Sequence, residues 1–312
     1  MVVEQAADVD IVGRLAPALR SFGSARTDLS RETLGAVRVS LNQRRREVAE
    51  RLDTATVGMA DDTAESIPIR IYRGGPTPAP AVIYCHAGAF VLGNLDTDHR
   101  QCVELARRGQ CTVVSVDYRL APEHPYPAAL DDAVAVLKWA ATNATELGID
   151  PGRLAVAGNS AGAALTACLA QRAAHGAVPP ITFQLLHQPV LDDRPTPSKA
   201  QFVTTPGFDG PATEQMWRYY LGDQRGGDDA VPGRRRELSG LAGAFISCSQ
   251  LDPLRDEALD YASRLLRAGV ATELHVIPAT CHGFDSLLPD WQTSQQLFEL
   301  QGRALRRAMH GA

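Results

Sequence analysis

The sequence predicts an α/β fold in which a mostly parallel sheet is flanked by helices. First, short and nearly all-apolar runs alternate with helical stretches from residue 67 to the C-terminus, as expected for strands covered on both faces. Second, a serine framed by glycines stands between one such run and the helical stretch after it. Third, the 312 residues are 45% hydrophobic and contain no visible linker, so we expect one domain, residues 1–312, with a sizeable core.

Seven runs are rich enough in β-branched and apolar residues to be predicted strands. The first alternates apolar and polar residues, as a half-buried strand does. In chain order the runs are Ile67–Tyr72, Ala81–Cys85, Thr112–Val116, Leu154–Ala157, Phe183–Leu186, Ala244–Cys248 and Glu273–Ile277.

Helical spacing of apolar residues fills most of the remaining chain. The first ~50 residues predict helices at Val12–Phe22 and Arg31–Leu52, the second with Ser30 as candidate N-cap. Between and after the strands we expect helices at Asp98–Arg108, Ala128–Asn143, Ala163–Ala174, Glu257–Ala268 and Thr293–Ala308. The stretch from Gln188 to about Leu238 breaks this rhythm, with many Pro, Asp and Gly residues and one helical piece at Glu214–Tyr220. A long irregular insertion of this kind is usually a lid or a binding segment.

Composition excludes several classes of function. The net charge is −5, and the short basic runs 44–46 and 234–236 are interpreted as solvated faces or loop charges, so no nucleic-acid partner is expected. No basic-then-apolar leader and no run of 18 apolar residues is visible, so we expect a cytoplasmic protein without a membrane partner. The six cysteines are scattered without a CxxC pair, which argues against a disulfide framework and a metal site. No cofactor motif is visible, and none is expected.

The most informative motif is Gly158-Asn159-Ser160-Ala161-Gly162, between a predicted strand and a predicted helix. In a nucleophile elbow the serine sits on a sharp strand-to-helix turn, where strand and helix come so close that side chains two residues before and after it must be nearly absent. Gly158 and Gly162 meet this need. The structural alternative is a Gly/Ser-rich turn that matches the elbow motif by chance.

A serine nucleophile needs a base, and the base needs an orienting acid. Asp252 follows the run Ala244–Cys248, and His282 follows the run Glu273–Ile277, so both fall on loops after neighbouring strands. Each has a structural alternative: Asp252 could begin a helix, and His282 could be an ordinary loop histidine. Acyl transfer also needs N–H donors for the developing oxyanion. Ala161 and the loop 86–90, after Ala81–Cys85, are the candidates.

Five motifs taken together resemble the hormone-sensitive-lipase family of α/β-hydrolases, in its microbial esterase branch. The resemblance runs from about Ile67 to the C-terminus and rests on the family's order of motifs: His86-Ala87-Gly88-Ala89, where the family has His-Gly-Gly-Gly, then 117–129 (Asp-Tyr-Arg-Leu-Ala-Pro-Glu-His-Pro-Tyr-Pro-Ala-Ala), 158–162, 252–256 (Asp-Pro-Leu-Arg-Asp) and 282–284 (His-Gly-Phe).

The resemblance implies an eight-stranded sheet with a helical cap, built from about residues 1–55 and 188–237. It implies a triad of Ser160, Asp252 and His282, with the N–H groups of Gly88, Ala89 and Ala161 as the oxyanion hole. His86 would brace its loop, and residues 118, 119 and 123 would hold loops near the elbow. The alanines at 87 and 89 depart from the family pattern, since alanine resists positive φ and adds a methyl group near the acyl carbon.

These residues predict a serine carboxylesterase for small short- to medium-chain acyl esters, acting through an acyl-serine intermediate. Two alternatives remain open: a deacetylase, amidase or acyltransferase that uses the same triad on one metabolite, and a non-catalytic ligand receptor. A homodimer is compatible with the sequence. Cys281 beside the base is interpreted as a small buried side chain rather than a reactive thiol. Candidates for an apolar pocket, with core packing as the alternative for each, are Phe90, Leu92, Phe202, Phe208, Met216, Trp217 and Tyr220.

Overall fold

A computed structural model describes residues 10–224 and 226–311. It contains one eight-stranded sheet with the strand order β1-β2-β4-β3-β5-β6-β7-β8. The two pairings that involve β2 are antiparallel and the other five are parallel, so the predicted mostly parallel sheet is confirmed. The strands are β1 (Gly58–Ala64), β2 (Ile67–Arg73), β3 (Ala79–Cys85), β4 (Thr112–Val116), β5 (Ile149–Asn159), β6 (Phe183–His187), β7 (Gly243–Leu251) and β8 (Thr272–Cys281).

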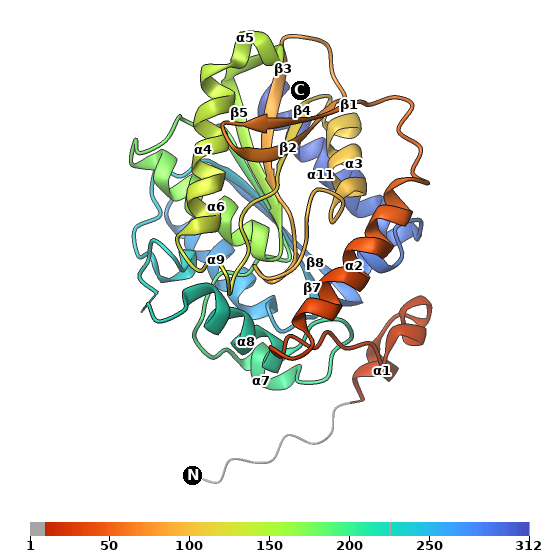
Figure 1. The fold of residues 1–312 in the computed structure, drawn as a ribbon. Coiled ribbons are helices and arrows are strands. Elements are labelled where there is room, and N and C mark those ends of the chain that lie inside the picture. Colours follow the sequence, from red (N-terminus) through yellow and green to blue (C-terminus); the bar gives the residue numbers. More distant parts are fainter. Residues whose placement is uncertain (1–9, 225, 312) are drawn as a thin grey trace.

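Helices cover both faces of this sheet (Figure 1). One face packs against α3 (His99–Gly109) and α11 (Gln292–His310), whose apolar side chains meet those of β3, β4 and β5. The other face packs against α4 (Ala128–Thr142), α6 (Ala161–Ala174) and α9 (Arg255–Arg267). The short helices α5 (Ala144–Leu147) and α10 (Phe284–Leu287) follow α4 and β8. The central strands β3 and β4 are buried along their whole length, as their apolar runs predict.

Strand β1 was missed by the sequence interpretation. Its sequence, Gly-Met-Ala-Asp-Asp-Thr-Ala, is exposed at all positions but the last, because it forms the outer edge of the sheet. An edge strand with both faces in water carries no hydrophobic pattern, and charged residues along such an edge oppose pairing with other chains. The pattern on which strand prediction depends is therefore absent here.

The two predicted N-terminal helices are shorter than expected. The first is divided into α1 (Ile11–Arg14) and the 3-10 helix η1 (Pro17–Phe22), because Ala16, which precedes a proline, adopts ψ 141°. The second is α2 (Leu34–Ala49), and its N-cap position is Thr33 rather than Ser30. Leu34 is its one fully buried residue, so α2 lies on the surface of the protein. In Figure 1 it runs along the side of the molecule, whereas α1, α7 and α8 lie at the bottom.

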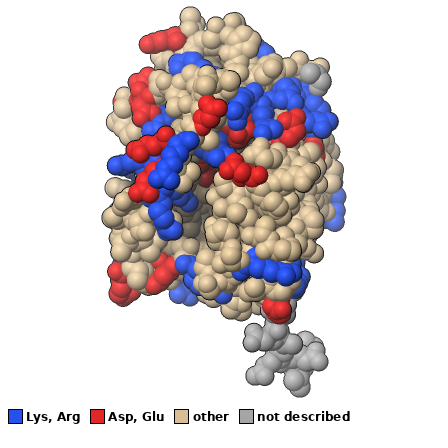
Figure 2. Space-filling view, turned by 90° about the vertical axis from the view of Figure 1, so that its right-hand side faces the viewer, with Lys and Arg blue, Asp and Glu red and all other residues tan. Residues whose placement is uncertain are grey.

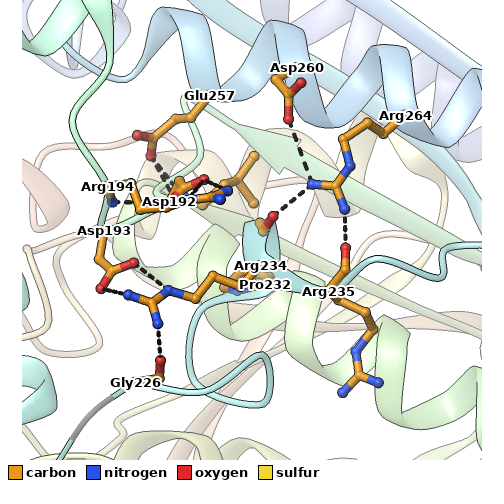
Figure 3. A network of polar contacts seen from close by, with 12 residues as sticks. Asp192, Asp193, Arg194, Gly226, Pro232, Arg234, Arg235, Glu257, Asp260 and Arg264 are labelled. Atoms are coloured by element: carbon orange, nitrogen blue, oxygen red, sulfur yellow. Dashed lines mark hydrogen bonds and ion pairs between the residues drawn. The ribbon is translucent and has the colours of Figure 1, made fainter.

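The insertion after β6 contains α7 (Pro197–Gln201), α8 (Gly210–Leu221) and the 3-10 turn η2 (Pro232–Arg234). Polar contacts tie it to α9 (Figure 3). Arg234 donates to both carboxylate oxygens of Asp193 at 2.7 and 2.6 Å, and Arg264 of α9 donates to the carbonyl group of Arg235. Glu257 of α9 accepts from the backbone N–H of Leu191 at 2.7 Å. Arg234 and Arg235 lie in and directly after the turn η2 and pair with Asp193 and Asp229, so these members of the basic run 234–236 are loop charges in ion pairs.

Candidate active site

Ser160 lies on a sharp turn between β5 and α6. Its backbone has φ 56° and ψ −117°, and its N–H donates to the carbonyl oxygen of His187 at 2.9 Å. A Cβ added to Gly162 would lie 2.0 Å from the carbonyl oxygen of Cys85, and one added to Gly158 would lie 2.5 Å from Gly162. Both distances are impossible for a side chain. The predicted steric reason for the two glycines is therefore confirmed.

The sheet brings Ser160, His282 and Asp252 together at the carboxyl ends of β5, β8 and β7. His282 Nε2 lies 3.0 Å from Ser160 Oγ, and His282 Nδ1 lies 2.8 Å from Asp252 Oδ2. The other oxygen of Asp252 accepts from the N–H of Leu254 at 2.8 Å, which fixes the carboxylate. With Nδ1–H donating to the carboxylate, Nε2 is the acceptor that can take the serine proton.

The loop after β3 supplies backbone donors opposite the serine. Gly88 has φ 137° and a Cβ there would lie 2.0 Å from the carbonyl oxygen of Leu92, so this position requires glycine. Ala89 has φ 54°, a left-handed conformation that costs an alanine about 1–2 kcal/mol. Within the described part of the chain, the N–H groups of Gly88, Ala89 and Ala161 have no hydrogen-bond acceptor. They are free to bind an oxyanion.

Ala87, the other departure from the family pattern, is not one of these donors. Its N–H donates to Asp98 at 2.8 Å, and Asp98 also accepts from the hydroxyl of Tyr84 at 3.0 Å. Sequence reasoning did not identify Asp98 as the anchor of this loop. His86 donates from Nδ1 to the carbonyl oxygen of Ala87 at 2.8 Å and stacks on Tyr118, whose hydroxyl donates to the carbonyl oxygen of His86. Burial lowers the pKa of His86 to about 4, so it is neutral near neutral pH.

Residues 119 and 123, expected to hold loops near the elbow, make ion pairs elsewhere. Arg119 pairs with Asp132 at the start of α4. Glu123 pairs with Arg38 of α2 at 2.7 and 2.8 Å, and this bond lowers the pKa of Glu123 to about 2. Arg38 also donates to the carbonyl oxygens of Val91 and Ala121. The pair therefore fastens α2 to the oxyanion loop rather than bracing the elbow.

Gln188 braces the loop that carries the histidine. It follows β6 directly and adopts φ 44°. Its side-chain oxygen accepts from the N–H of Gly283 at 2.7 Å, and its side-chain nitrogen donates to Ser249 Oγ at 2.7 Å. Ser249 in turn donates to the carbonyl oxygen of Cys281 at 2.9 Å. Sequence reasoning missed Gln188, although a polar residue at the carboxyl end of the strand beside β5 was a signal for it.

A second serine, histidine and aspartate contact one another behind the first three. His187 at the end of β6 has Nδ1 2.9 Å from Ser247 Oγ of β7 and Nε2 3.1 Å from Asp285 Oδ1. All three side chains are buried. Burial alone would raise the pKa of Asp285, but His187 and the amide of Gln101, 2.8 Å away, hold it below its ordinary value. We call these three residues the buried trio.

A cavity of about 370 Å³ opens beside Ser160 and His282. Its walls come from the oxyanion loop, the start of α3, residues 283–289 and one side of α2, which contributes Leu41, Val48 and Ala49. Of the seven predicted apolar pocket residues, only Leu92 and Phe208 line it. The other five are packed elsewhere: Phe90, for example, stacks on Tyr220 at 3.8 Å. The sequence interpretation did not assign α2 residues to this wall.

Cys281 is fully buried, and burial raises its pKa to about 12, so it is an inert thiol as expected. The described part of the chain contains no cluster of three or more His, Cys, Asp or Glu side chains suited to a metal ion. None of the helices in residues 10–224 and 226–311 combines the length and apolarity needed to cross a bilayer.

Comparison with known proteins gives a consistent result. The family model described as the α/β-hydrolase fold matches residues 82–286. Esterase LipI of Mycobacterium tuberculosis is 43% identical over 232 residues, 72% of each protein, and carboxylesterase NlhH of the same species is 39% identical over 269 residues, 83% of each. The crystal structure of esterase LipW from Mycobacterium marinum superposes with a TM-score of 0.94 at 61% identity, covering 96% of this chain and 97% of that one.

Proposed function

Because this chain belongs to the α/β-hydrolase fold family, in its hormone-sensitive-lipase-like carboxylesterase group, and is itself a carboxylic ester hydrolase, we propose that it cleaves esters through an acyl intermediate on Ser160. The observation that carries this proposal is the unbroken set of contacts from Asp252 through His282 to Ser160, at the wall of a cavity. In this proposal His282 takes the serine proton as Ser160 attacks the acyl carbon. It then gives that proton to the departing alcohol.

Charge develops on the acyl oxygen when Ser160 attacks. The free N–H groups of Gly88, Ala89 and Ala161 are the proposed donors to it, and one such donor is worth roughly 3–4 kcal/mol in comparable enzymes. A water molecule, activated by His282, then attacks the acyl-serine. Asp252 keeps the imidazole in the tautomer that both halves of the reaction need and stabilises its cationic form.

The substrate in this proposal is a small ester with a short or medium acyl chain. A cavity of about 370 Å³ supports a small ligand, since drug-sized sites begin near 300 Å³. We propose that residues 10–55 and 188–237 act as the cap, because α2 and Phe208 contribute to the cavity wall. The cap predicted from the sequence also included residues 1–9, which lie outside the described residues.

The acyl-enzyme is tested with p-nitrophenyl esters from acetate to octanoate. We expect a burst of p-nitrophenol stoichiometric with the protein, and acyl or fluorophosphonate labelling of Ser160 in peptide mass spectra. No turnover across the series in a folded sample would contradict hydrolysis of generic esters. If only one natural acylated metabolite were turned over, the deacetylase, amidase or acyltransferase alternative would replace it. Binding without any labelling of Ser160 would favour the receptor alternative.

A further inference from the structure

Arg45 of α2 places a cation in the wall of the cavity that contains Ser160. Its Nη1 is buried, and within residues 10–224 and 226–311 no group accepts a hydrogen bond from it. This position lies in the basic run 44–46, for which a solvated face was the expected interpretation. For Arg45 that interpretation was wrong.

The acids that share the cavity are held by other partners. Asp96 pairs with Arg70 at 2.8 Å, and Asp285 is bound by His187 and Gln101. Asp98 accepts from Tyr84 and from the backbone of Ala87. The charge of Asp98 acts on Arg45, but no ion pair joins them within the described residues.

The rim above Arg45 is also basic. Arg44, the preceding residue of α2, lines the same cavity and makes no ion pair with a described residue. Figure 2 shows the molecule hollowed on this face, with basic side chains along one edge of the hollow. An anion approaching the cavity from this edge meets unpaired positive charge, which steers it inward.

A guanidinium whose Nη1 is buried and unpaired is costly, because that nitrogen has lost its water and no protein group replaces it. Arginine remains protonated in proteins, so the charge is not relieved by loss of a proton. Its planar donors match a carboxylate in a bidentate arrangement better than any other side chain does. A ligand carboxylate would supply the partner that the protein leaves out.

We propose that Arg45 forms a carboxylate subsite, so that the preferred substrate is an ester bearing a second, ionised carboxyl group away from the ester bond. The inference rests on the proposed function, since it names the substrate class of that same site. The carboxylate is present in the bound ester before Ser160 attacks and is unchanged by the reaction. Its contact with Arg45 therefore strengthens ground state and transition state alike, and its loss raises KM with little effect on kcat.

Two matched substrate series test the subsite. On the acyl side, monoethyl succinate, glutarate and adipate are compared with ethyl butanoate, pentanoate and hexanoate. On the alcohol side, the acetate esters of 3-hydroxypropanoate and 4-hydroxybutanoate are compared with propyl and butyl acetate. Turnover is followed by pH-stat at neutral pH and fixed ionic strength, because salt screens exposed charges. The series that responds identifies the side of the ester that carries the carboxylate.

In Arg45→Gln we expect kcat/KM for the carboxylate-bearing esters to fall at least about tenfold more than for their neutral partners, through KM, in one of the two series. Arg46→Gln is the matched control. It removes the same charge from the same helix, but its side chain is 68% exposed and does not line the cavity. In this variant the ratio of the two substrate classes should stay within about twofold of the wild-type ratio.

The melting temperature separates a substrate contact from a structural one. Removal of an unpaired buried charge should leave the Tm of Arg45→Gln at or above that of the wild type. If Arg45 instead stabilised the fold as the counter-ion of Asp98, the Tm would fall, and this result would overturn the proposal. Arg45→Met is the second variant. If neither Arg45→Gln nor Arg45→Met folds, the proposal is likewise overturned.

Two further outcomes distinguish the proposals. If the wild type hydrolyses neutral esters, but Arg45→Gln changes both classes by one factor, the carboxylate subsite is wrong and the esterase proposal stands. If neutral esters turn over and no carboxylate-bearing ester does, the carboxylate subsite is also wrong and the esterase proposal again stands. If no ester of either series turns over, or if Ser160→Ala retains turnover, the proposed function itself fails.

Discussion

Two groups of serine, histidine and aspartate lie next to each other at the carboxyl ends of the strands, and only in the first do the serine and the histidine line the cavity. In the first, His282 Nε2 contacts Ser160 and Nδ1 contacts Asp252. In the buried trio the imidazole is reversed, with His187 Nδ1 on Ser247 and Nε2 on Asp285. The two are connected, because the carbonyl oxygen of His187 accepts the N–H of Ser160.

The backbone accounts for most of the difference. Ser160 sits at φ 56° on a turn, and the N–H of the next residue, Ala161, has no acceptor among the described residues. Ser247 lies within β7, where its neighbours' N–H and C=O groups are used by the sheet, and its side chain is inaccessible. The same three side chains can therefore serve chemistry or packing. Access and free backbone donors, rather than side-chain identity, distinguish the two.

The serines are expected to show the largest difference. Ser160→Ala should lower kcat by at least about 10⁴-fold, since the nucleophile is lost. Ser247→Ala should leave kcat within about threefold and instead lower stability by about 1 kcal/mol, the usual value of one buried hydrogen bond. Ester turnover and urea unfolding of both variants measure this. A loss of turnover in Ser247→Ala comparable to that in Ser160→Ala would show that the buried trio takes part in the reaction.

The two aspartates should differ as the serines do, with Asp252 important for kcat and Asp285 for stability. Asp252→Asn should reduce kcat by about 10³- to 10⁴-fold with little loss of stability, because the amide favours the wrong tautomer of His282. Asp285→Asn should reduce stability by about 2–4 kcal/mol, since it replaces a buried carboxylate that His187 and Gln101 contact. Thermal melts and kcat are measured on both. Equal stability losses would mean that the two aspartates have the same role.

His86 provides a third imidazole, one that lacks a carboxylate partner. Its folded-state pKa of about 4 lies below the ordinary 6.5. As the pH falls from 6.5 toward 4, the histidine is therefore protonated in the unfolded chain but still neutral in the folded protein. This group's contribution to the free energy of unfolding is full above about pH 6.5 and is lost as the pH falls toward 4, by about 3 kcal/mol. Urea unfolding between these pH values should be less pH-dependent in His86→Gln than in the wild type. If the free energy of unfolding depended on pH equally in His86→Gln and in the wild type, this prediction would be contradicted.

A smaller effect is expected at Gln188, which holds the loop that carries His282. Gln188→Ala should lower kcat about tenfold with KM nearly unchanged, because a misplaced base weakens proton transfer without weakening binding. It should also alter the pH profile of kcat/KM, which a purely structural change would leave alone. Gln184→Ala is the matched control. Gln184 is a buried glutamine on β6, the strand that precedes Gln188, and its side-chain amide donates to the carbonyl oxygen of Ala242 rather than to a residue at the site. Equal effects in both variants would indicate general destabilisation.

The smallest effect is expected at Ala89, which lines the cavity. Ala89→Gly should raise kcat/KM for esters of bulky alcohols a few-fold, by removing the methyl group and relieving the strain of φ 54°. Esters of ethanol should change less than those of tertiary butanol. An equal change for both alcohols would show that the methyl group does not limit the room for the alcohol.

Local motifs predicted the parts of the site that depend on local geometry. The two glycines around Ser160 are required by contacts with a turn and a strand, and their spacing is visible in five residues. The strands with apolar runs were also predicted, because a run of apolar residues is visible within a few positions of the sequence. The contacts of Asp252 with His282 could be expected because both follow neighbouring strands of one sheet.

Features that depend on distant packing were not predictable in the same way. Arg38 and Gln188 act through hydrogen bonds with residues far away in the chain, and Arg45 faces a cavity whose other walls are equally distant in sequence. Nothing in their immediate neighbours marks these positions. Candidate pocket residues such as Phe90 and Trp217 were apolar residues in the right segments, but apolarity does not tell whether a residue faces a cavity or the core. The oligomeric state likewise remains a prediction.

Helix α2 has a consequence for how this protein can change over evolution. It supplies one wall of the cavity, yet only Leu34 among its residues is fully buried, and Arg38 fastens it to the rest of the protein. Substitutions at Val48 or Ala49 can therefore reshape the cavity while leaving the sheet core and the elbow glycines untouched. Selectivity can therefore change through the exposed helix α2, separately from the geometry around Ser160.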